Sequence, residues 1–191
     1  CLAYFAWPSM LPPGRGWELT HHLMLIDFIE RTWRLPDATL AGAMQEMATA
    51  PPGLHLVASL LGSWIGRDGF SAVYFVVAFA VALKLTVVYF IAAREFADSG
   101  SRIPLAAVGT LLCLLPSGFV LRSFVHDSSL ARVAAELFVA GMWWAVVVWD
   151  AHPSRTVAAL FALLGAGAFL TWPASVGPPV VTLVAVMATA R

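Results

Sequence analysis

Side chains capable of acid–base or metal chemistry gather near the start of the chain. Glu18, His21 and His22 follow one another closely, and Glu18 and His22 would share one face of a helix because they are four residues apart. A carboxylate there can act as a general base or bind a metal. Glu18 and His22 could both bind a metal ion, although two ligands do not complete a zinc site. A divalent metal ion therefore remains one of the alternatives to the general base. A simpler interpretation is that Glu18 is a first-turn acid that stabilises the helix N-terminus.

Four further charged or titratable residues stand out on either side of this group. Arg15 precedes Glu18, and His55 directly follows the turn sequence Pro51-Pro52-Gly53-Leu54. His126 and Asp127 are adjacent and lie between two apolar runs. In isolation, a histidine beside a Pro-Pro-Gly turn, such as His55, is more often simply a residue at a helix start.

Two charged residues interrupt apolar runs. Lys84 is the only charge between Gly69 and Ala93, and Glu136 is the only charge between Val133 and Trp149. A charge inside a membrane is costly, so such residues usually pair with one another or line a cavity. The alternative for Lys84 is that its long stem reaches the membrane surface. Glu136 is near the end of its run and could also reach the surface.

The composition predicts an all-α membrane protein. Only 12% of the residues are charged, against about a quarter in soluble domains, and the mean hydropathy is +0.83. The net charge is zero and no basic cluster is interleaved with aromatic residues, which argues against nucleic acid as a partner. The two cysteines, Cys1 and Cys113, support neither a disulfide framework nor a cysteine metal site.

Several apolar runs are long enough for helical spans, which need about 20 mostly apolar residues. Residues 1–11 are predicted to be the end of a first transmembrane helix, and residues 12–68 a large outer loop. Residues 69–191 are predicted to form a polytopic transmembrane bundle of about four further spans, the last one truncated. The spans are expected at Gly69–Ala93, Ile103–Leu121, Val133–Trp149 and Thr156–Trp172, with a break near Pro173. Because the terminal runs are short, we expect a fragment of a larger membrane protein.

The predicted outer loop contains its own helices. Leu19–Trp33 has apolar residues at helical spacing with charges between them, which predicts an amphipathic helix lying on the membrane interface. Leu35-Pro36 ends it, and residues 38–50 suggest a loose helix. Leu54–Ile65 is apolar but only about 18 Å long as a helix, which favours a juxtamembrane or re-entrant position. Gly66–Gly69 then turns the chain into the first complete span.

This order of features resembles the first outer loop of the polytopic glycosyltransferases of the C superfamily (GT-C), which use polyprenyl-phosphate sugars. The matching pieces are Gly16-Trp17-Glu18, the Leu19–Trp33 helix, Leu35-Pro36, the Ala50–His55 turn and the Ala58–Gly66 helix. The resemblance covers about the first half of the chain. A second acidic pair of that family is missing, although His126-Asp127 could take its place.

The resemblance implies an inverting transfer of a sugar from a polyprenyl phosphate to a cell-envelope acceptor. Glu18 would be the catalytic base or a metal ligand. The residues expected to bind the lipid phosphate or substrate are Arg15, His21, His22, His55, His126 and Asp127. The partners would be the lipid-linked sugar, the bilayer and further spans of the parent chain.

Basic residues predict the orientation, because Arg and Lys concentrate in cytoplasmic loops. Placing Arg94, Arg102 and Arg155 inside puts residues 12–68 on the outer face. The composition suggests a bacterial plasma membrane. The competing hypothesis is a non-catalytic transporter segment in which Lys84 and Glu136 form an intramembrane pair. A third is a transferase-like scaffold that binds lipid without turnover.

Overall fold

The computed structural model describes residues 17–37, 39–40, 42–96, 100–113 and 129–189, and every regular element in these ranges is helical. The chain order is α2 (Trp17–Thr32), α3 (Ala43–Met47), α4 (Gly53–Ile65), α5 (Gly69–Glu95), α6 (Arg102–Leu112), α7 (Leu130–Ala151), α8 (Arg155–Thr171), η2 (Pro173–Ser175) and α9 (Gly177–Thr189). The predicted all-α class is confirmed for these ranges.

Turn chemistry explains the boundaries of the first helices. α2 ends where Trp33 adopts a left-handed conformation, with φ at 53°, shortly before Pro36. α4 ends at Gly66, whose left-handed backbone allows its N–H to bond the Gly62 carbonyl. Asp68 then caps α5, because its side chain accepts a hydrogen bond of 2.9 Å from the Ser71 N–H.

In the part of the chain that the structure describes, two helices are long and apolar enough to cross a membrane. α5 has 27 residues and α7 has 22, which corresponds to about 40 and 33 Å of helix. α8 has 17 residues and is capped by the side chain of Ser154. The predicted break near Pro173 is present as the short helix η2 between α8 and α9.

The predicted span Ile103–Leu121 differs from the structure in extent. The helix there, α6, runs from Arg102 only to Leu112, and residues 114–128 are outside the described ranges. Eleven residues make about 16 Å of helix, which is half of a bilayer core. α6 packs against α5.

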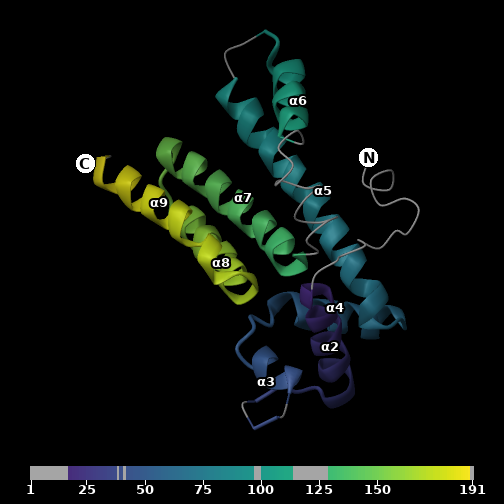
Figure 1. Cartoon of the computed structure of the whole chain (residues 1–191). Helices are drawn as coiled ribbons and strands as arrows, with labels where there is room; N and C mark the ends of the chain where they lie inside the picture. Colours follow the sequence, from purple (N-terminus) through teal and green to yellow (C-terminus); the bar gives the residue numbers. More distant parts are fainter. Residues whose placement is uncertain (1–16, 38, 41, 97–99, 114–128, 190–191) are drawn as a thin grey trace.

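The helices form two groups that meet at the end where α2, α3 and α4 lie (Figure 1). α7, α8 and α9 run together, while α5 crosses from α4 to α6. Glycines allow close contact between α7 and α8: a Cβ at Gly141 would come within 2.9 Å of Leu164, and one at Gly167 within 2.8 Å of the Phe138 ring.

The apolar stripe of α2 is used inside the protein. Leu25, Ile26 and Ile29 are buried, and Ile26 belongs to a core that also contains Leu54 from α4 and Val73 from α5. The helix is also tied to the start of α5, because Glu30 accepts a 2.6 Å hydrogen bond from the backbone N–H of residue 69. The amphipathic pattern therefore reflects packing against α4 and α5, rather than lipid contact alone.

Candidate functional site

Three predicted site residues come together in one small cavity of about 210 Å³, here called the histidine pocket. α2 contributes two histidines, the start of α4 the third, and the start of α7 an arginine. Its lining residues are His21, His22, Met47, Ala50, Pro51, His55, Ser129, Ala131, Arg132 and Trp172. The cavity is thus built from segments that are far apart in the sequence, and most of its lining surface is apolar.

His22 and His55 are in direct contact. Their rings stack with centroids 5.0 Å apart, and Nδ1 of His22 lies 2.8 Å from Nε2 of His55. One of these two nitrogens donates a hydrogen to the other, which requires at least one ring to be neutral. The contact joins α2 to α4 and places both imidazoles at the wall of the pocket.

His55 is the more buried ring, with 2% of its surface exposed. Burial, and after it the neighbouring His22, lowers the pKa of His55 to about 3, while hydrogen bonds with the backbone of Pro51 and Pro52 act in the opposite direction. The ring is therefore neutral near pH 7. It offers hydrogen bonds to a ligand or to His22, and no charge.

The positive charge at the pocket wall comes from Arg132, which the sequence analysis did not select. Its side chain is 53% exposed and its Nε lies 3.6 Å from Oε1 of Glu136, one helical turn further on. The i, i+4 spacing of these two residues at the start of an apolar run is a signal that the sequence does contain.

Lys84 and Glu136 form an ion pair across α5 and α7. The Nζ of Lys84 is 2.5 Å from Oε2 of Glu136, and Lys84 is 1% exposed. The alternative in which Lys84 extends to the membrane surface is therefore wrong, because the amine is inside the helix bundle. Glu136 thus holds Lys84 with one oxygen and faces Arg132 with the other.

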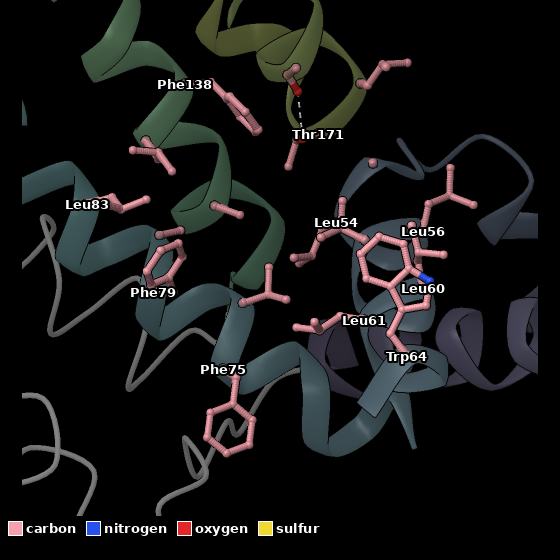
Figure 2. A pocket seen from close by; sticks show the side chains of 18 residues that line it. Leu54, Leu56, Leu60, Leu61, Trp64, Phe75, Phe79, Leu83, Phe138 and Thr171 are labelled. Carbon is pink, nitrogen blue, oxygen red and sulfur yellow. Dashed lines mark hydrogen bonds between the residues drawn. The ribbon is translucent and has the colours of Figure 1, made fainter. Parts of the chain in front are cut away.

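A larger apolar groove adjoins the histidine pocket. It has a volume of about 810 Å³ and is lined almost entirely by hydrocarbon side chains of α4, α5, α7 and α8. Figure 2 shows residues from these helices around it, among them Leu54, Leu60, Trp64, Phe79, Leu83, Phe138 and Thr171. Many of these side chains are exposed, Trp64 by 75% and Phe79 by 65%.

α4, α7 and the C-terminal end of α8 each contribute residues to the groove and a neighbouring residue or turn to the histidine pocket. At the start of α4, Leu54 lines the groove and His55 the pocket. At the end of α8, Thr171 lines the groove and the next residue, Trp172, the pocket. Near the start of α7, Ala131 lines the pocket and Ala134, one turn further on, lines the groove. The two cavities are therefore neighbours, and the smaller one is the one that three histidines and Arg132 line.

The other predicted site residues are placed less fully. Glu18 lies in the first turn of α2, one turn before His22. Arg15, His126 and Asp127 lie outside the described residues, as does the predicted span at residues 1–11. Within the described ranges, no three His, Cys, Asp or Glu side chains form a metal-binding group.

Comparison of the chain with protein-family models, with curated proteins and with solved structures finds no match.

Proposed function

We propose that this protein is a membrane glycosyltransferase of the GT-C kind, which transfers a sugar from a polyprenyl phosphate to a cell-envelope acceptor. The observation that carries the proposal is the proximity of the histidine pocket to the large apolar groove, since neighbouring residues such as Leu54 and His55 line one cavity each. A polyprenyl-phosphate sugar has an anionic head and a long hydrocarbon chain, so it needs a polar site with donors beside an apolar surface. The resemblance of the first half of the chain to GT-C enzymes supports the same conclusion.

The proposed reaction needs one base and one site for the leaving group. Glu18 accepts the proton of the acceptor hydroxyl, and the hydroxyl oxygen forms a bond to the anomeric carbon of the sugar. The bond from that carbon to the phosphate oxygen breaks, and the electron pair leaves with the lipid phosphate. Hydrogen-bond donors and Arg132 in the histidine pocket stabilise the charge that develops on this phosphate.

In the proposal, the reaction takes place at the level of the lipid head groups. α5 and α7 have the length and composition of spans, and α2, α3 and α4 gather at the end where these helices start. A carboxylate at that level is near the depth of a lipid head group. In the proposal this end faces outward from a bacterial plasma membrane, in agreement with the distribution of Arg residues in the sequence.

The test compares sugar transfer in membranes that contain the wild-type protein or the variant Glu18→Gln. Membranes receive a radiolabelled polyprenyl-phosphate sugar, and the label that reaches the acceptor fraction is counted. We expect transfer to fall by about a hundredfold or more at equal protein level, the usual cost of removing a general base. Glu46→Gln, an exposed acid on α3, serves as the control and should keep full activity. Equal transfer by wild type and Glu18→Gln would remove Glu18 as the base.

One observation favours a second candidate, an ion-coupled transporter segment. Lys84 and Glu136 form a buried pair between two helices of spanning length, and such pairs can couple ion movement to conformational change. In a transporter the double variant Lys84→Met/Glu136→Gln abolishes coupled uptake. In the transferase it retains sugar transfer, because the reacting groups are elsewhere. The same membranes can be assayed for both activities.

A further inference from the structure

His22 and His55 share a hydrogen bond whose direction decides the protonation of both rings. Nδ1 of His22 lies 2.8 Å from Nε2 of His55, so one nitrogen carries the hydrogen and the other accepts it. The distance alone is compatible with either direction. The surroundings of the second nitrogen of His55 select between them, because a neutral imidazole carries a single N–H.

The backbone that interacts with His55 can only accept hydrogen bonds. It belongs to Pro51 and Pro52, one turn before His55, and both residues favour a proton on the ring. Proline has no N–H, so the carbonyl oxygen is the group that acts. Because Nε2 of His55 is directed at His22, these carbonyls act on Nδ1. Nδ1 is buried and is not fully aligned with either oxygen, so the carbonyls attract its hydrogen without forming an ideal bond.

The two directions of the hydrogen bond differ in what they leave at Nδ1 of His55. A hydrogen on Nδ1 is attracted by the carbonyl oxygens and leaves Nε2 as the acceptor for His22. The reverse direction places the lone pair of Nδ1 against oxygens that carry lone pairs themselves. A buried acceptor without a donor costs free energy, and with 2% of His55 exposed bulk water cannot supply that donor.

The hydrogen of the contact therefore belongs to His22. Its Nδ1 donates to Nε2 of His55, and it keeps this hydrogen in the neutral and in the charged form of the ring, since an imidazolium carries both. The proton that His22 gains or loses is consequently the one on its Nε2. His22 has a further interaction besides this contact. The assignment does not depend on it, because it follows from the surroundings of His55.

We infer that His22 is the residue of the histidine pocket that exchanges a proton, at its Nε2, and that His55 is a positioning residue that fixes this tautomer. Both rings line the pocket. A histidine whose Nδ1–H is held by a neighbour and whose Nε2 exchanges the proton has the arrangement of a general base.

The use of His22 in sugar transfer rests on the proposed function. Glu18 lies one turn before His22 on α2. In the proposed reaction the carboxylate of Glu18 takes the proton of the acceptor hydroxyl. His22 then accepts this proton at Nε2 and passes it to water, which restores the carboxylate for the next transfer.

The elements around the pocket carry other charged or titratable residues. These are Glu18 and His21 on α2, Glu46 on α3, His55 on α4, Tyr74 on α5 and Arg132 on α7. A positive charge near His22 opposes its second proton, and a carboxylate favours it. These residues therefore affect how readily His22 binds the proton, but not which of its nitrogens does so.

The experiment records ¹⁵N NMR spectra of the full-length protein in nanodiscs, with the label in the histidine side chains. The ¹⁵N shift of a ring nitrogen distinguishes an N–H from a bare nitrogen, and replacing each histidine in turn by glutamine assigns the signals. His55→Leu removes the acceptor for His22, whereas His55→Gln keeps one in its amide oxygen. His152→Gln, at an exposed histidine after α7, is the control.

Near pH 7 we expect a hydrogen on Nδ1 of both His22 and His55 and a bare Nε2 in His55. Between pH 7 and pH 5, His55 should stay neutral, and any change in His22 should be at Nε2. His55→Leu should allow the hydrogen of neutral His22 to move to Nε2, and His55→Gln should return it to Nδ1. A merely structural role of His55 does not predict this rescue.

Three results would overturn the inference. A hydrogen on Nε2 of neutral His55, or a bare Nδ1 in His22, would reverse the direction of the hydrogen bond. An unchanged tautomer of His22 in His55→Leu would remove the positioning role. If His55→Leu does not fold, the wild-type spectrum still decides the direction, and a bare Nδ1 of His22 in His55→Gln would still remove the positioning role.

Sugar transfer by His22→Gln tests the use of the exchanged proton and separates this inference from the proposed function. We expect a loss of about a hundredfold, the usual contribution of a proton-transfer group. The expected tautomers in a protein without sugar transfer would leave the inference intact and reject the proposed function. Transfer that depends on Glu18 but not on His22 would keep the transferase and exclude His22 as the acceptor of the proton.

Discussion

Burial changes what a histidine can contribute to this site. His55 follows a Pro-Pro-Gly turn, a position from which the sequence predicts a phosphate contact. In the structure the ring is 2% exposed and its pKa is lowered to about 3, so it is neutral near pH 7. A neutral imidazole can donate one hydrogen bond and accept another, but it brings no positive charge to a ligand.

The neutral state of His55 predicts that the fold is sensitive to acid. The unfolded chain binds a proton at His55 below about pH 6.5, whereas the folded chain does so only near pH 3. The unfolded state therefore binds more protons in this window, and the free energy of unfolding falls by about 1.4 kcal/mol for each pH unit below 6.5. Thermal unfolding of the solubilised protein between pH 7 and pH 4 measures the slope.

The variant His55→Gln should lose this part of the slope, because glutamine can still bond His22 but does not titrate. His152→Gln, which replaces an exposed histidine after α7, should keep it. Identical slopes in all three proteins would show that His55 does not control the acid response.

Most of the site residues can be selected from the sequence, but their protonation states cannot. His21, His22 and His55 could be selected by type and by turn context. Arg132 could have been selected as well, because it is four residues before the intramembrane Glu136. Neutrality of His55 could not be predicted, because it depends on contacts with α2 and on the burial that packing produces.

At the scale of the helices, small residues determine how closely the elements approach. A Cβ on Gly53 would meet the backbone oxygen of Leu170 at 2.8 Å, so the start of α4 touches the end of α8. A Cβ on Gly167 would meet the Phe138 ring at 2.8 Å, and this contact sets the separation of α7 and α8. These are the helices that form the walls of both cavities.

Gly167→Ala should destabilise the packing of α7 against α8. The added carbon is too close to the Phe138 ring, so the helices must separate, at a cost of about 1 to 3 kcal/mol. Gly165→Ala is the matched control two residues away. Its Cβ would meet Met142 at an ordinary 3.5 Å, so we expect equal or slightly higher stability. Thermal unfolding of both variants measures the difference, and a similar melting temperature would contradict the predicted contact.

Residues that end or cap a helix made several helix boundaries predictable. Pro36, Gly66 and Asp68 each mark a boundary that the structure confirms, because their effects act within one turn. It was less predictable whether the apolar stripe of α2 faces lipid or packs against other helices. Amphipathic spacing is the same for a helix that faces lipid and for one that packs on other helices, and only the fold shows that Ile26 contacts the core.

For the molecule as a whole, the histidine pocket lies at one end of the long helices, and the apolar groove extends from there to Leu83 in the middle of α5. The histidine pocket uses the starts of α4 and α7 and the end of α8, and the turn into α5 lies close by. In the proposed orientation this end faces outward. The opposite end contains the turn between α7 and α8.

This arrangement predicts opposite accessibility for two exposed positions. Arg67 lies in the turn before α5, and His152 lies in the turn after α7. In a background with Cys1 and Cys113 replaced by serine, Arg67→Cys should react with a membrane-impermeant maleimide in intact cells. His152→Cys should react only after the membrane is opened. Labelling of both in intact cells would reject the topology, and labelling of His152→Cys alone would invert it.

The pairing of Lys84 with Glu136 shows where prediction from sequence ends. Each residue is conspicuous in its own apolar run, and the sequence analysis kept two explanations for Lys84. The choice between them depends on how α5 and α7 face each other, which no local pattern specifies across 52 residues of separation. Helix content and approximate spans follow from composition, whereas this contact follows from the arrangement of the bundle.

The same ion pair has a consequence for biogenesis. During synthesis α5 emerges first, with a lysine whose insertion on its own costs about 2.5 to 3.5 kcal/mol. Its acidic partner is made 52 residues later, which takes about 3 to 10 seconds at common translation rates. α5 is nevertheless apolar enough to enter lipid alone, with a mean hydropathy of 2.4. We therefore expect Lys84 to stay in the bilayer at this cost until α7 follows and brings the Glu136 carboxylate to it.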